Sequence, residues 1–463
     1  MDLLLGLDAE ALPAIAATLT VDDEPVPNSA KEPACSKISE DSVKGTQCTE
    51  RLARAGGTLG VTDHTLHAQG PAAADLQSSI CVRDTGDGRG LGVFALRPFH
   101  KDDVVFTERP ELAAVVRTEG AACDWCLRAL CSCPSGLPHG EFWPVAPHET
   151  CCQICRTRWC CASCRKLAEA CGHSRLCAAA ATGRLAAFSD CCSQQLSVSA
   201  DPRIVRGAAL LVLRMVAHIC SVAAEGDSDE SRANALRLYT HLSGAEPGGD
   251  ELGGPESAAA RQLHSLLAPT LALSATDQAW IDEATIRRLL RGTLANFAQL
   301  QPISAFSDYV CASRRARYAS GGASLAALRK HTEELRARHP ERLADAMCPD
   351  AVGDEMYGVS GCGIFKLQSK LNHSCAPTVR RVCAFTDASL DLVACRDIVP
   401  GEELTNAYVD PALEGPRRRQ ILRATYGFVC ACSKCAPERL QPSRRHEQAN
   451  AEACRQAVEP ESA

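Results

Sequence analysis

Apolar residues recur every three to four positions through the middle of the chain, between 201 and 347. This spacing predicts amphipathic helices, because residues three and four apart share one helical face. Pro202 stands where a helix tolerates proline at its start, and Pro269 and Pro340 mark two expected ends. A Gly/Glu/Pro-rich stretch at 243–256 predicts a loop. The expected helices are Ile204–Ala224, Ser231–Leu242, Ala258–Leu267, Ala284–Leu300 and Leu325–Arg338.

Shorter apolar runs on both sides of this helical block predict β-strands, since turn residues bound them. A Gly-rich turn at Asp84–Gly90 separates the first two strands, and Thr386–Ala388 forms the turn of a later hairpin. A short basic helix is expected at Arg417–Tyr426. The expected strands are Ile80–Arg83, Leu91–Leu96, Asp102–Thr107, Gly361–Gln368, Thr378–Phe385, Ser389–Cys395 and Glu403–Tyr408.

The two ends of the chain lack such patterning. Residues 1–78 are rich in Ala, Thr, Ser and Pro, and residues 438–463 are charged, so both are expected to be disordered. The first residues are acidic and their apolar run is too short for a signal peptide. No stretch reaches the roughly 18 apolar residues of a membrane span. We therefore expect no membrane partner.

Charge and cysteine usage narrow the function further. The 463 residues carry a formal net charge of −7, so no global positive field attracts nucleic acid. This argues against direct nucleic-acid binding and against a zinc-dependent DNA binder. There are 28 cysteines without a secretion signal, which favours a reducing compartment where clustered thiols hold metal. The expected location is the nucleus, the cytoplasm or both.

Cysteines recur at the short spacings that zinc ligands use. Two C-x2-C pairs are followed by C-x3-C and H-x3-C, whose spacing suits one face of a helix. Near the end, a C-x-C-x2-C turn supplies three ligands, and a distant cysteine supplies the fourth. Free thiols or disulfides are the alternative. The predicted ligands are Cys123, Cys126, Cys152, Cys155, Cys160, Cys164, His173 and Cys177 for two zinc sites, and Cys375, Cys430, Cys432 and Cys435 for a third.

Four motifs follow one another along the chain: Gly88–Ala95, Asn372-His373-Ser374-Cys375, Gly401–Tyr408 and the C-x-C-x2-C turn at Cys430–Cys435. In this order they resemble the SET domain of protein-lysine methyltransferases with its cysteine-rich post-SET tail. The resemblance implies an α+β fold: a mostly-β SET domain split by a MYND zinc finger and a helical insertion, with a zinc-binding post-SET tail. The implied divisions are a leader 1–78, SET residues 79–122, the finger 123–177, the insertion 178–350, catalytic SET residues 351–411, the post-SET segment 412–437 and a tail 438–463.

The first eight ligands resemble a MYND finger, whose interleaved topology implies how they divide between two zinc ions. Roughly 25 residues separate the two C-x2-C pairs, which is longer than in a compact finger. Cys160 is chosen over its neighbour Cys161 because Trp159-Cys160 matches the family's aromatic-Cys pair. Five spare thiols leave the register ambiguous: Cys131, Cys133, Cys151, Cys161 and Cys171. The implied sets are Cys123, Cys126, Cys160 and Cys164 for one ion, and Cys152, Cys155, His173 and Cys177 for the other.

The SET resemblance implies roles for individual residues. Tyr408 would lie beside the reacting sulfur and amine as the catalytic residue, whereas by itself it reads as a core tyrosine ending a strand. The methyl donor would be S-adenosylmethionine. Phe428 would stack on the adenine or wall the lysine channel, or be an ordinary packed residue. Tyr357 could line that channel. The implied donor-binding residues are Gly88, Arg89, Gly90, Asn372, His373, Tyr408 and Phe428.

Two positions depart from the family's pattern. Thr378 stands where the family usually has Asn, and Ala407 stands where it often has Ser. Both could alter loop hydrogen bonding and channel width. The long finger spacer and the short tail resemble a divergent member that lacks the family's C-terminal helical repeat domain.

The expected function is therefore methyl transfer from S-adenosylmethionine to lysines of histone or non-histone proteins. Three structural zinc ions are expected, and a proline-containing peptide is a possible partner of the MYND finger. The rival is a catalytically silent SET/MYND zinc protein that acts as a peptide-binding scaffold. The presence of Tyr408, Asn372, Gly88 and Gly90 counts against it.

Overall fold

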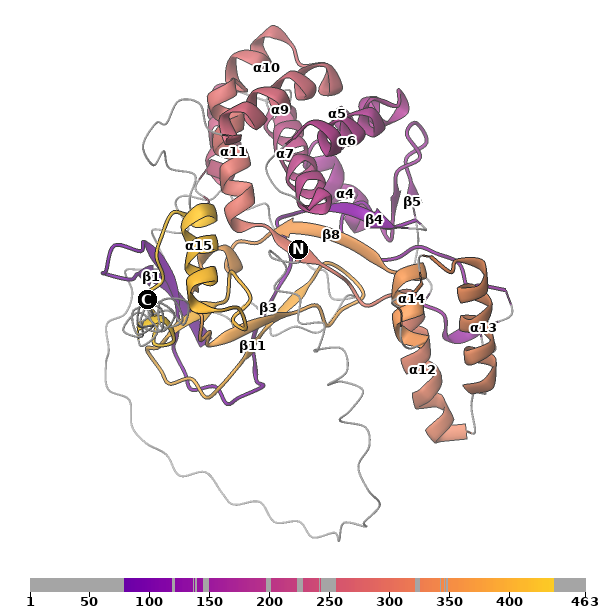
Figure 1. Cartoon of the computed structure of the whole chain (residues 1–463). Coiled ribbons are helices and arrows are strands. Elements are labelled where there is room, and N and C mark those ends of the chain that lie inside the picture. Colours follow the sequence, from indigo (N-terminus) through magenta and orange to yellow (C-terminus); the bar gives the residue numbers. More distant parts are fainter. Residues whose placement is uncertain are drawn as a thin grey trace, which may run out of the picture. The chain divides into compact units, whose positions relative to one another are not determined.

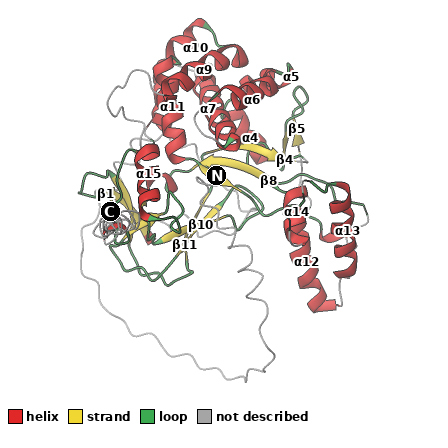
Figure 2. Ribbon diagram, viewed as in Figure 1, coloured by secondary structure: helices red, strands yellow, loops and turns green. Residues whose placement is uncertain are grey.

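The computed structural model describes residues 79–436, with gaps at 119–120, 136, 138–139, 145–149, 197–200, 223–227, 241, 243–254, 321–324, 342, 345 and 347–348. The predicted leader 1–78, the tail 438–463 and most of the loop 243–256 lie outside the described residues. The chain divides into two compact units. The larger holds Leu59–Asn372 and Pro377–Asn406, and the smaller includes His373–Ala376 and the residues from Ala407 on. Figure 1 follows the chain by sequence and Figure 2 by secondary structure.

Small antiparallel sheets form the β part of the larger unit. Their orders are β1-β2-β12-β9, β10-β11-β3, β4-β8-β7 and β5-β6. In the first, Val93 of the central strand pairs with Val82 on one side and Leu404 on the other. The strands are β1 (Ile80–Asp84), β2 (Leu91–Ala95), β3 (Val104–Glu108), β4 (Leu112–Thr118), β5 (Thr150–Cys151), β6 (Arg158–Trp159), β7 (Ala298–Leu300), β8 (Val359–Ile364), β9 (Asn372–His373), β10 (Val379–Val382), β11 (Leu390–Ala394) and β12 (Glu403–Asn406).

Each predicted strand is present, although some ends differ. The strand expected at Gly361–Gln368 ends at Ile364, and further along the backbone N–H groups of Leu367 and Gln368 bond the side chain of Glu108 instead of a strand. The last strand ends at Asn406, so Tyr408 lies beyond it rather than within it. Five strands were not expected: β4, β5, β6, β7 and β9. Of these, β4 and β7 both pair with β8, so the partner that makes them strands is distant in sequence.

Helices make up most of the chain between the two β parts. The expected helix 325–338 is present with the predicted ends, and 204–224, 231–242, 258–267 and 417–426 are present with one or both ends shifted. The helices are α4 (Ala162–Ala170), α5 (His173–Ala181), α6 (Arg184–Gln195), α7 (Pro202–Val222), α8 (Ser228–Thr240), α9 (Pro255–Leu271), α10 (Ala275–Trp280), α11 (Glu283–Asn296), α12 (Ala305–Ser320), α13 (Leu325–Arg338), α14 (Pro349–Tyr357) and α15 (Gly415–Tyr426), with 3-10 turns η1 (Gly140–Phe142) and η2 (Gln368–Lys370).

Two helical expectations were wrong in detail. Pro269 does not end its helix, because α9 continues to Leu271 with the proline inside its last turn. The helix expected at Ala284–Leu300 ends at Asn296, and Ala298–Leu300 forms β7 instead. There the chain pairs with β8, and this non-local pairing overrides the helical spacing. The middle of the chain is therefore not purely helical.

Helix α7 is the centre of the helical core. Its buried residues cover nearly the whole circumference, and it packs against β4, β8 and the helices α6, α8 and α11. It is long and apolar enough to cross a membrane, yet 78% of its most apolar window is buried inside the protein. A helix that is apolar all round is expected at such a core position, so burial accounts for its composition.

The smaller unit is built around α15. Ile421 and Leu422 of this helix pack with Val409 and with three buried cysteines. Gly427 ends the helix in the left-handed conformation with φ 76°, which glycine adopts without steric cost. The turn sends the following residues back along the helix. The cysteines are Cys375, Cys430 and Cys435.

Candidate functional site

Four cysteines from two segments of the larger unit meet in what we call the first thiol cluster. Their ligand atoms all lie within 4.8 Å of one another. The Sγ atoms of Cys126 and Cys160 are 3.6 Å apart, and those of Cys160 and Cys164 are 3.5 Å apart. A disulfide needs about 2 Å, so these are separate thiols held at close range. The cluster consists of Cys123, Cys126, Cys160 and Cys164.

Cys161 lies outside this cluster although it follows Cys160 directly. It is the N-cap of α4, where its Sγ accepts the backbone N–H of Cys164 at 3.5 Å. This contact satisfies a free donor of the first helical turn. The structure thus groups Cys160 with the cluster and gives Cys161 a capping role. The other spare thiols, Cys131, Cys133, Cys151 and Cys171, are likewise outside the clusters found among the described residues.

The second thiol cluster joins the β5–β6 hairpin to α5. Its ligand atoms also lie within 4.8 Å of one another. The Cys152 and Cys177 sulfurs are 3.6 Å apart, and His173 Nε2 lies 3.7 Å from the Cys155 sulfur. Hydrogen bonding by His173 lowers the pKa of Cys152 to about 6, which favours the thiolate, the form that binds metal. The cluster consists of Cys152, Cys155, His173 and Cys177.

The third thiol cluster lies in the smaller unit and draws its members from two segments far apart in sequence. The Cys375 Sγ lies 4.0 Å from that of Cys430 and 3.5 Å from that of Cys435. The guanidinium of Arg418, which is 1% exposed, lies 3.8 Å from the Cys435 sulfur. A buried cation offsets the negative charge that thiolates would gather here. The cluster consists of Cys375, Cys430, Cys432 and Cys435.

Aromatic rings surround Tyr408 in the same unit. The Tyr408 ring centroid lies 5.2 Å from that of His373 and 6.5 Å from that of Phe428. Tyr426, the last residue of α15, lies nearer still at 4.9 Å. Sequence reasoning placed Tyr408, His373 and Phe428 at the site but missed Tyr426. Its signal was an aromatic residue two positions before Phe428, with the glycine turn at 427 between them.

His373 is bonded through both ring nitrogens. Its Nδ1 accepts the backbone N–H of Tyr408 at 3.0 Å, and its Nε2 lies 3.2 Å from the Cys375 sulfur. Burial, with a smaller contribution from the charge of Arg418, lowers the pKa of His373 to about 4. The imidazole is therefore neutral near physiological pH.

In the larger unit, Glu403 joins the predicted donor-binding turn to Asn372. Arg89 donates to both carboxylate oxygens of Glu403, at 3.1 and 2.8 Å. The Asn372 amide donates to the same carboxylate at 2.8 Å and to the carbonyl of Leu91 at 3.2 Å. Sequence reasoning assigned Arg89 and Asn372 but missed Glu403. The signal was the acidic pair of the Gly401-Glu402-Glu403 motif, whose partners are distant in sequence.

The glycines of this turn leave its backbone open. Gly86, Gly88 and Gly90 have φ of 77°, 84° and 80°, which disfavours any side chain there. A Cβ at any of them would have no heavy atom within 4 Å. The turn is anchored by Asp87, whose pKa is lowered to about 2 by hydrogen bonds from Thr85 and Arg89. It is thus a fixed, accessible strip of backbone that a ligand can approach closely.

Tyr357 belongs to a different aromatic group. Its ring stacks on that of Phe306 at 5.7 Å and lies edge-on to that of Trp143 at 5.5 Å. Its hydroxyl lies 3.1 Å from His331 Nε2. These are the contacts of a packed residue within α12, α13, α14 and the η1 turn, and they do not support a channel role.

Glu108, at the end of β3, supports the segment that leads to Asn372. Its carboxylate accepts the backbone N–H groups of Leu367 and Gln368 at 2.7 and 2.8 Å. Burial raises the pKa of Glu108 to about 7, against the lowering effect of these two bonds. Two orphan donors are thereby satisfied where β8 has ended. No sequence pattern indicates this role, because a lone Glu after a strand is normally a surface residue.

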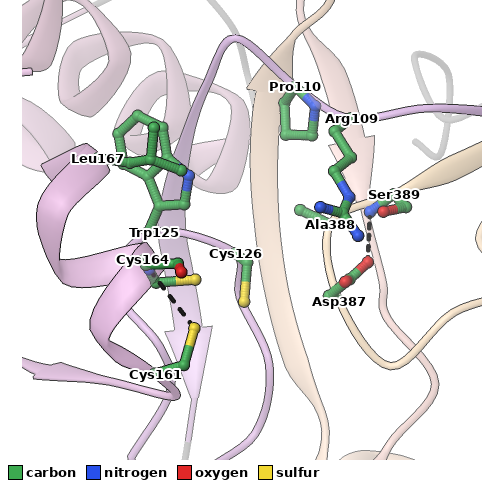
Figure 3. Close-up of a pocket in the computed structure, with 11 residues that line it drawn as sticks. Arg109, Pro110, Trp125, Cys126, Cys161, Cys164, Leu167, Asp387, Ala388 and Ser389 are labelled. Carbon is green, nitrogen blue, oxygen red and sulfur yellow. Dashed lines mark hydrogen bonds between the residues drawn. The ribbon is translucent and has the colours of Figure 1, made fainter. Parts of the chain in front are cut away.

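A pocket lies between the first thiol cluster and the β10–β11 turn (Figure 3). Trp125 and Leu167 form one apolar wall, and Pro110 lies across from them. Arg109 and Asp387 bring charged groups to the side opposite the cysteines. The remaining lining residues are Cys126, Cys161, Ser163, Cys164, Ala388 and Ser389.

The sequence is similar to that of proteins whose chemical activity is known. Residues 90–409 match the family model of the SET domain. Protein-lysine N-trimethyltransferase SMYD5 of Homo sapiens is 28% identical over 397 residues, covering 79% of this chain and 88% of that protein. SMYD5 of Danio rerio is 27% identical over 395 residues, 78% of this chain and 88% of that protein. Histone-lysine N-methyltransferase SET5 of Candida albicans is 42% identical over 83 residues, 18% of each chain.

The raised pKa of Glu108 predicts a pH-dependent stability. Since the folded protein holds this proton more tightly than the unfolded chain, stability should fall as pH rises from the unfolded carboxyl pKa toward 7. Between about pH 5.5 and 7 the loss should be about 2 kcal/mol. The glutamine side chain of Glu108→Gln cannot ionise. The thermal midpoint of this variant should therefore rise relative to that of the wild type as pH increases across this range.

Thermal unfolding of both proteins, followed across that pH range, measures the effect. Glu169→Gln, which removes an exposed carboxyl on α4, is the control and should track the wild type. A Glu108→Gln midpoint that runs parallel to the wild type at every pH would contradict the prediction.

Proposed function

Because the chain belongs to the SET domain family, we propose that it transfers methyl groups from S-adenosylmethionine to protein lysines with Tyr408 beside the reacting atoms. The match covers most of the chain, and the relatives named above are protein-lysine or histone-lysine methyltransferases. The protein is therefore a protein-lysine methyltransferase acting on histones or other proteins. The bond of Tyr408 to His373, which in turn lies against Cys375, supports the proposed role of Tyr408.

The open turn at Gly86–Gly90 fits the donor, because its backbone can be approached without obstruction by a side chain. We assign donor binding to Gly88, Arg89, Gly90 and Asn372 of the larger unit and to His373, Tyr408 and Phe428 of the smaller unit. Arg89 and Asn372 both bond the carboxylate of Glu403. The Gly86–Gly90 turn and the side-chain amide of Asn372 therefore keep a constant distance from each other. The donor supplies a methyl group on a sulfonium, which the neutral ε-amine of a lysine attacks in line.

The chain's own residues must position that amine. Free lysine titrates near 10.4, so only about one in a thousand is neutral near pH 7.4. A site that excludes water and fixes the approach raises the rate without acid-base chemistry. Tyr408 sits among the rings of His373, Tyr426 and Phe428, a half-buried apolar setting suited to this work. Its hydroxyl would orient the attack and stabilise charge as it redistributes.

The three thiol clusters fit zinc, since each holds four sulfur or imidazole ligand atoms within 4.8 Å of one another. Four protein ligands fill a tetrahedral ion and leave no open position, so these sites would be structural. We assign the first two clusters to a MYND finger at 123–177 that, with the insertion 178–350, splits the SET domain into 79–122 and 351–411. The third joins Cys375 of the SET residues to a post-SET segment at 412–437. The remaining proposed divisions are a leader at 1–78 and a tail at 438–463.

We assign the pocket of Figure 3 to a proline-containing peptide that docks at the finger. Trp125 offers an aromatic wall on which a proline ring can pack, and Leu167 and Pro110 extend the apolar lining. The charges of Arg109 and Asp387 would set the direction of the peptide backbone and its flanking residues. Histone substrates would place the protein in the nucleus, and non-histone substrates in the cytoplasm as well.

Tyr408→Phe should abolish most methyl transfer while the protein stays folded and binds the donor. Removing one stabilising hydroxyl at a reacting centre costs about 10²- to 10³-fold in rate. The assay follows labelled methyl from S-adenosylmethionine into a histone and whole-lysate protein panel, with donor affinity measured by calorimetry. Tyr309→Phe, in the α12 core, is the matched control. Wild-type protein that neither binds donor nor transfers methyl would favour the peptide-binding scaffold instead.

Cys432→Ser should lower the zinc content from three ions to two and weaken donor binding, because the third cluster would lose a ligand. Metal is measured by mass spectrometry of the purified protein, and donor affinity by calorimetry. Cys311→Ser removes an exposed thiol outside the clusters and should keep all three ions. Unchanged donor affinity in Cys432→Ser would contradict the prediction that the third thiol cluster supports donor binding.

Trp125→Ala should weaken binding of a proline-containing peptide by about tenfold, roughly 1.4 kcal/mol. Fluorescence anisotropy of labelled peptides, with each proline-containing sequence paired with its alanine analogue, measures the difference. Trp280→Ala on α10 removes a tryptophan that does not line the pocket and is the control. Equal affinity of wild type and Trp125→Ala for the proline-containing peptide would exclude this pocket.

A further inference from the structure

The side chain of His373 connects the third thiol cluster to the main chain of Tyr408. Its two ring nitrogens point to different partners, the Cys375 sulfur at 3.2 Å and the Tyr408 backbone N–H at 3.0 Å. All three residues lie within the smaller unit. His373 is 9% exposed, so water hardly competes for either bond.

The bond to Tyr408 fixes the position of the ring proton. A backbone N–H can only donate, so Nδ1 must be the unprotonated, accepting nitrogen. The ring proton is therefore on Nε2, which faces the Cys375 sulfur. His373 thus donates to that sulfur and accepts from Tyr408 at the same time. Both nitrogens are occupied, so the imidazole has no ring nitrogen left for the donor molecule, and donor contact would fall to the backbone of His373.

The side chain of His373 thus forms a bridge between Cys375 and Tyr408, and the Cys375 end of this bridge is the rigid one. Cys375 is 2% exposed, and its sulfur is held among Cys430 and Cys435. A group that donates to a metal-binding side chain fixes its orientation, and removing such a group typically weakens metal binding 10- to 100-fold. The same ring also packs against the Tyr408 ring, with centroids 5.2 Å apart and planes tilted by 52°.

We propose that His373 is a positioning residue that holds Tyr408 in register with the third thiol cluster, so that metal binding at Cys375 orders the catalytic tyrosine. This rests on the role proposed above for Tyr408. The hydrogen bond to its backbone fixes the position of Tyr408 relative to His373, and the ring contact sets the direction of its side chain. Loss of the bond to Cys375 should therefore have a different effect from loss of the bond to Tyr408.

Two substitutions separate the two ends. In His373→Asn the amide oxygen stands near the place of Nδ1, so the Tyr408 bond can form while the donor to Cys375 is lost. In His373→Gln the amide nitrogen stands near the place of Nε2, so the Cys375 bond can form while the acceptor for Tyr408 is lost. His373→Ala loses both. The holoenzyme is used throughout, and folding is verified by the thermal midpoint.

We expect His373→Asn to release zinc to a chelator about tenfold faster than the wild type, and His373→Gln to release it at nearly the wild-type rate. We expect the reverse order at Tyr408. Hydrogen exchange of its amide should be faster in His373→Gln than in His373→Asn, and kcat should fall about tenfold in His373→Gln with KM for the protein substrate little changed.

Two results would overturn the proposal. One is that Asn and Gln variants match the Ala variant in zinc release, amide exchange and kcat, which would reduce His373 to packing. The other is wild-type behaviour of His373→Gln in both amide exchange and kcat. Failure of the proposed function looks different: Tyr408→Phe would keep its methyl transfer, while zinc release and amide exchange would still report on the His373 bridge.

Discussion

Close approach of thiol groups is the constraint on which the short cysteine-bearing segments of this molecule depend. Each thiol cluster packs four ligand atoms within 4.8 Å, and thiolates at that range repel one another unless a cation lies among them. The segments that carry them are too short to bury a core of their own, so ligand binding has to supply much of their folding free energy. In the smaller unit, Cys375 is joined to Cys430 and Cys435 in this way, and the surroundings of Tyr408 are built on that junction.

Polar side chains carry that order outward. His373 ties the third thiol cluster to Tyr408, and Arg418 lies beside Cys435 from within α15. In the larger unit, Glu403 plays a comparable part for Arg89 and Asn372. In each case a side-chain hydrogen bond, rather than a run of sequence, fixes the geometry of a residue assigned to chemistry.

The sequence predicted the parts of the structure that local chemistry determines. Cysteine spacing identified the candidate ligands, the resemblance to a MYND finger divided eight of them between two clusters, and alternating apolar residues located strands such as Leu91–Ala95. What it missed depends on distant partners. Ala298–Leu300 reads as the end of a helix until β8 pairs with it, and Glu108 reads as a surface carboxylate until the Leu367 and Gln368 amides reach it. Tyr426 and Glu403 joined the site for the same reason, since no spacing rule identifies a neighbour that arrives by tertiary folding.

The pairing of β4 with β8 has a consequence for the newly made chain. Ala114 meets Cys362, which follows 248 residues later. At the usual rate of about 5–20 residues per second, a ribosome needs roughly ten seconds to a minute to make that stretch. Through this time the buried residues of β4 have no strand partner, and an unpaired apolar edge invites association with other chains. The cysteines at 123–177 emerge early in the same interval. The first and second thiol clusters can therefore assemble long before the strand partner of β4 has been synthesised.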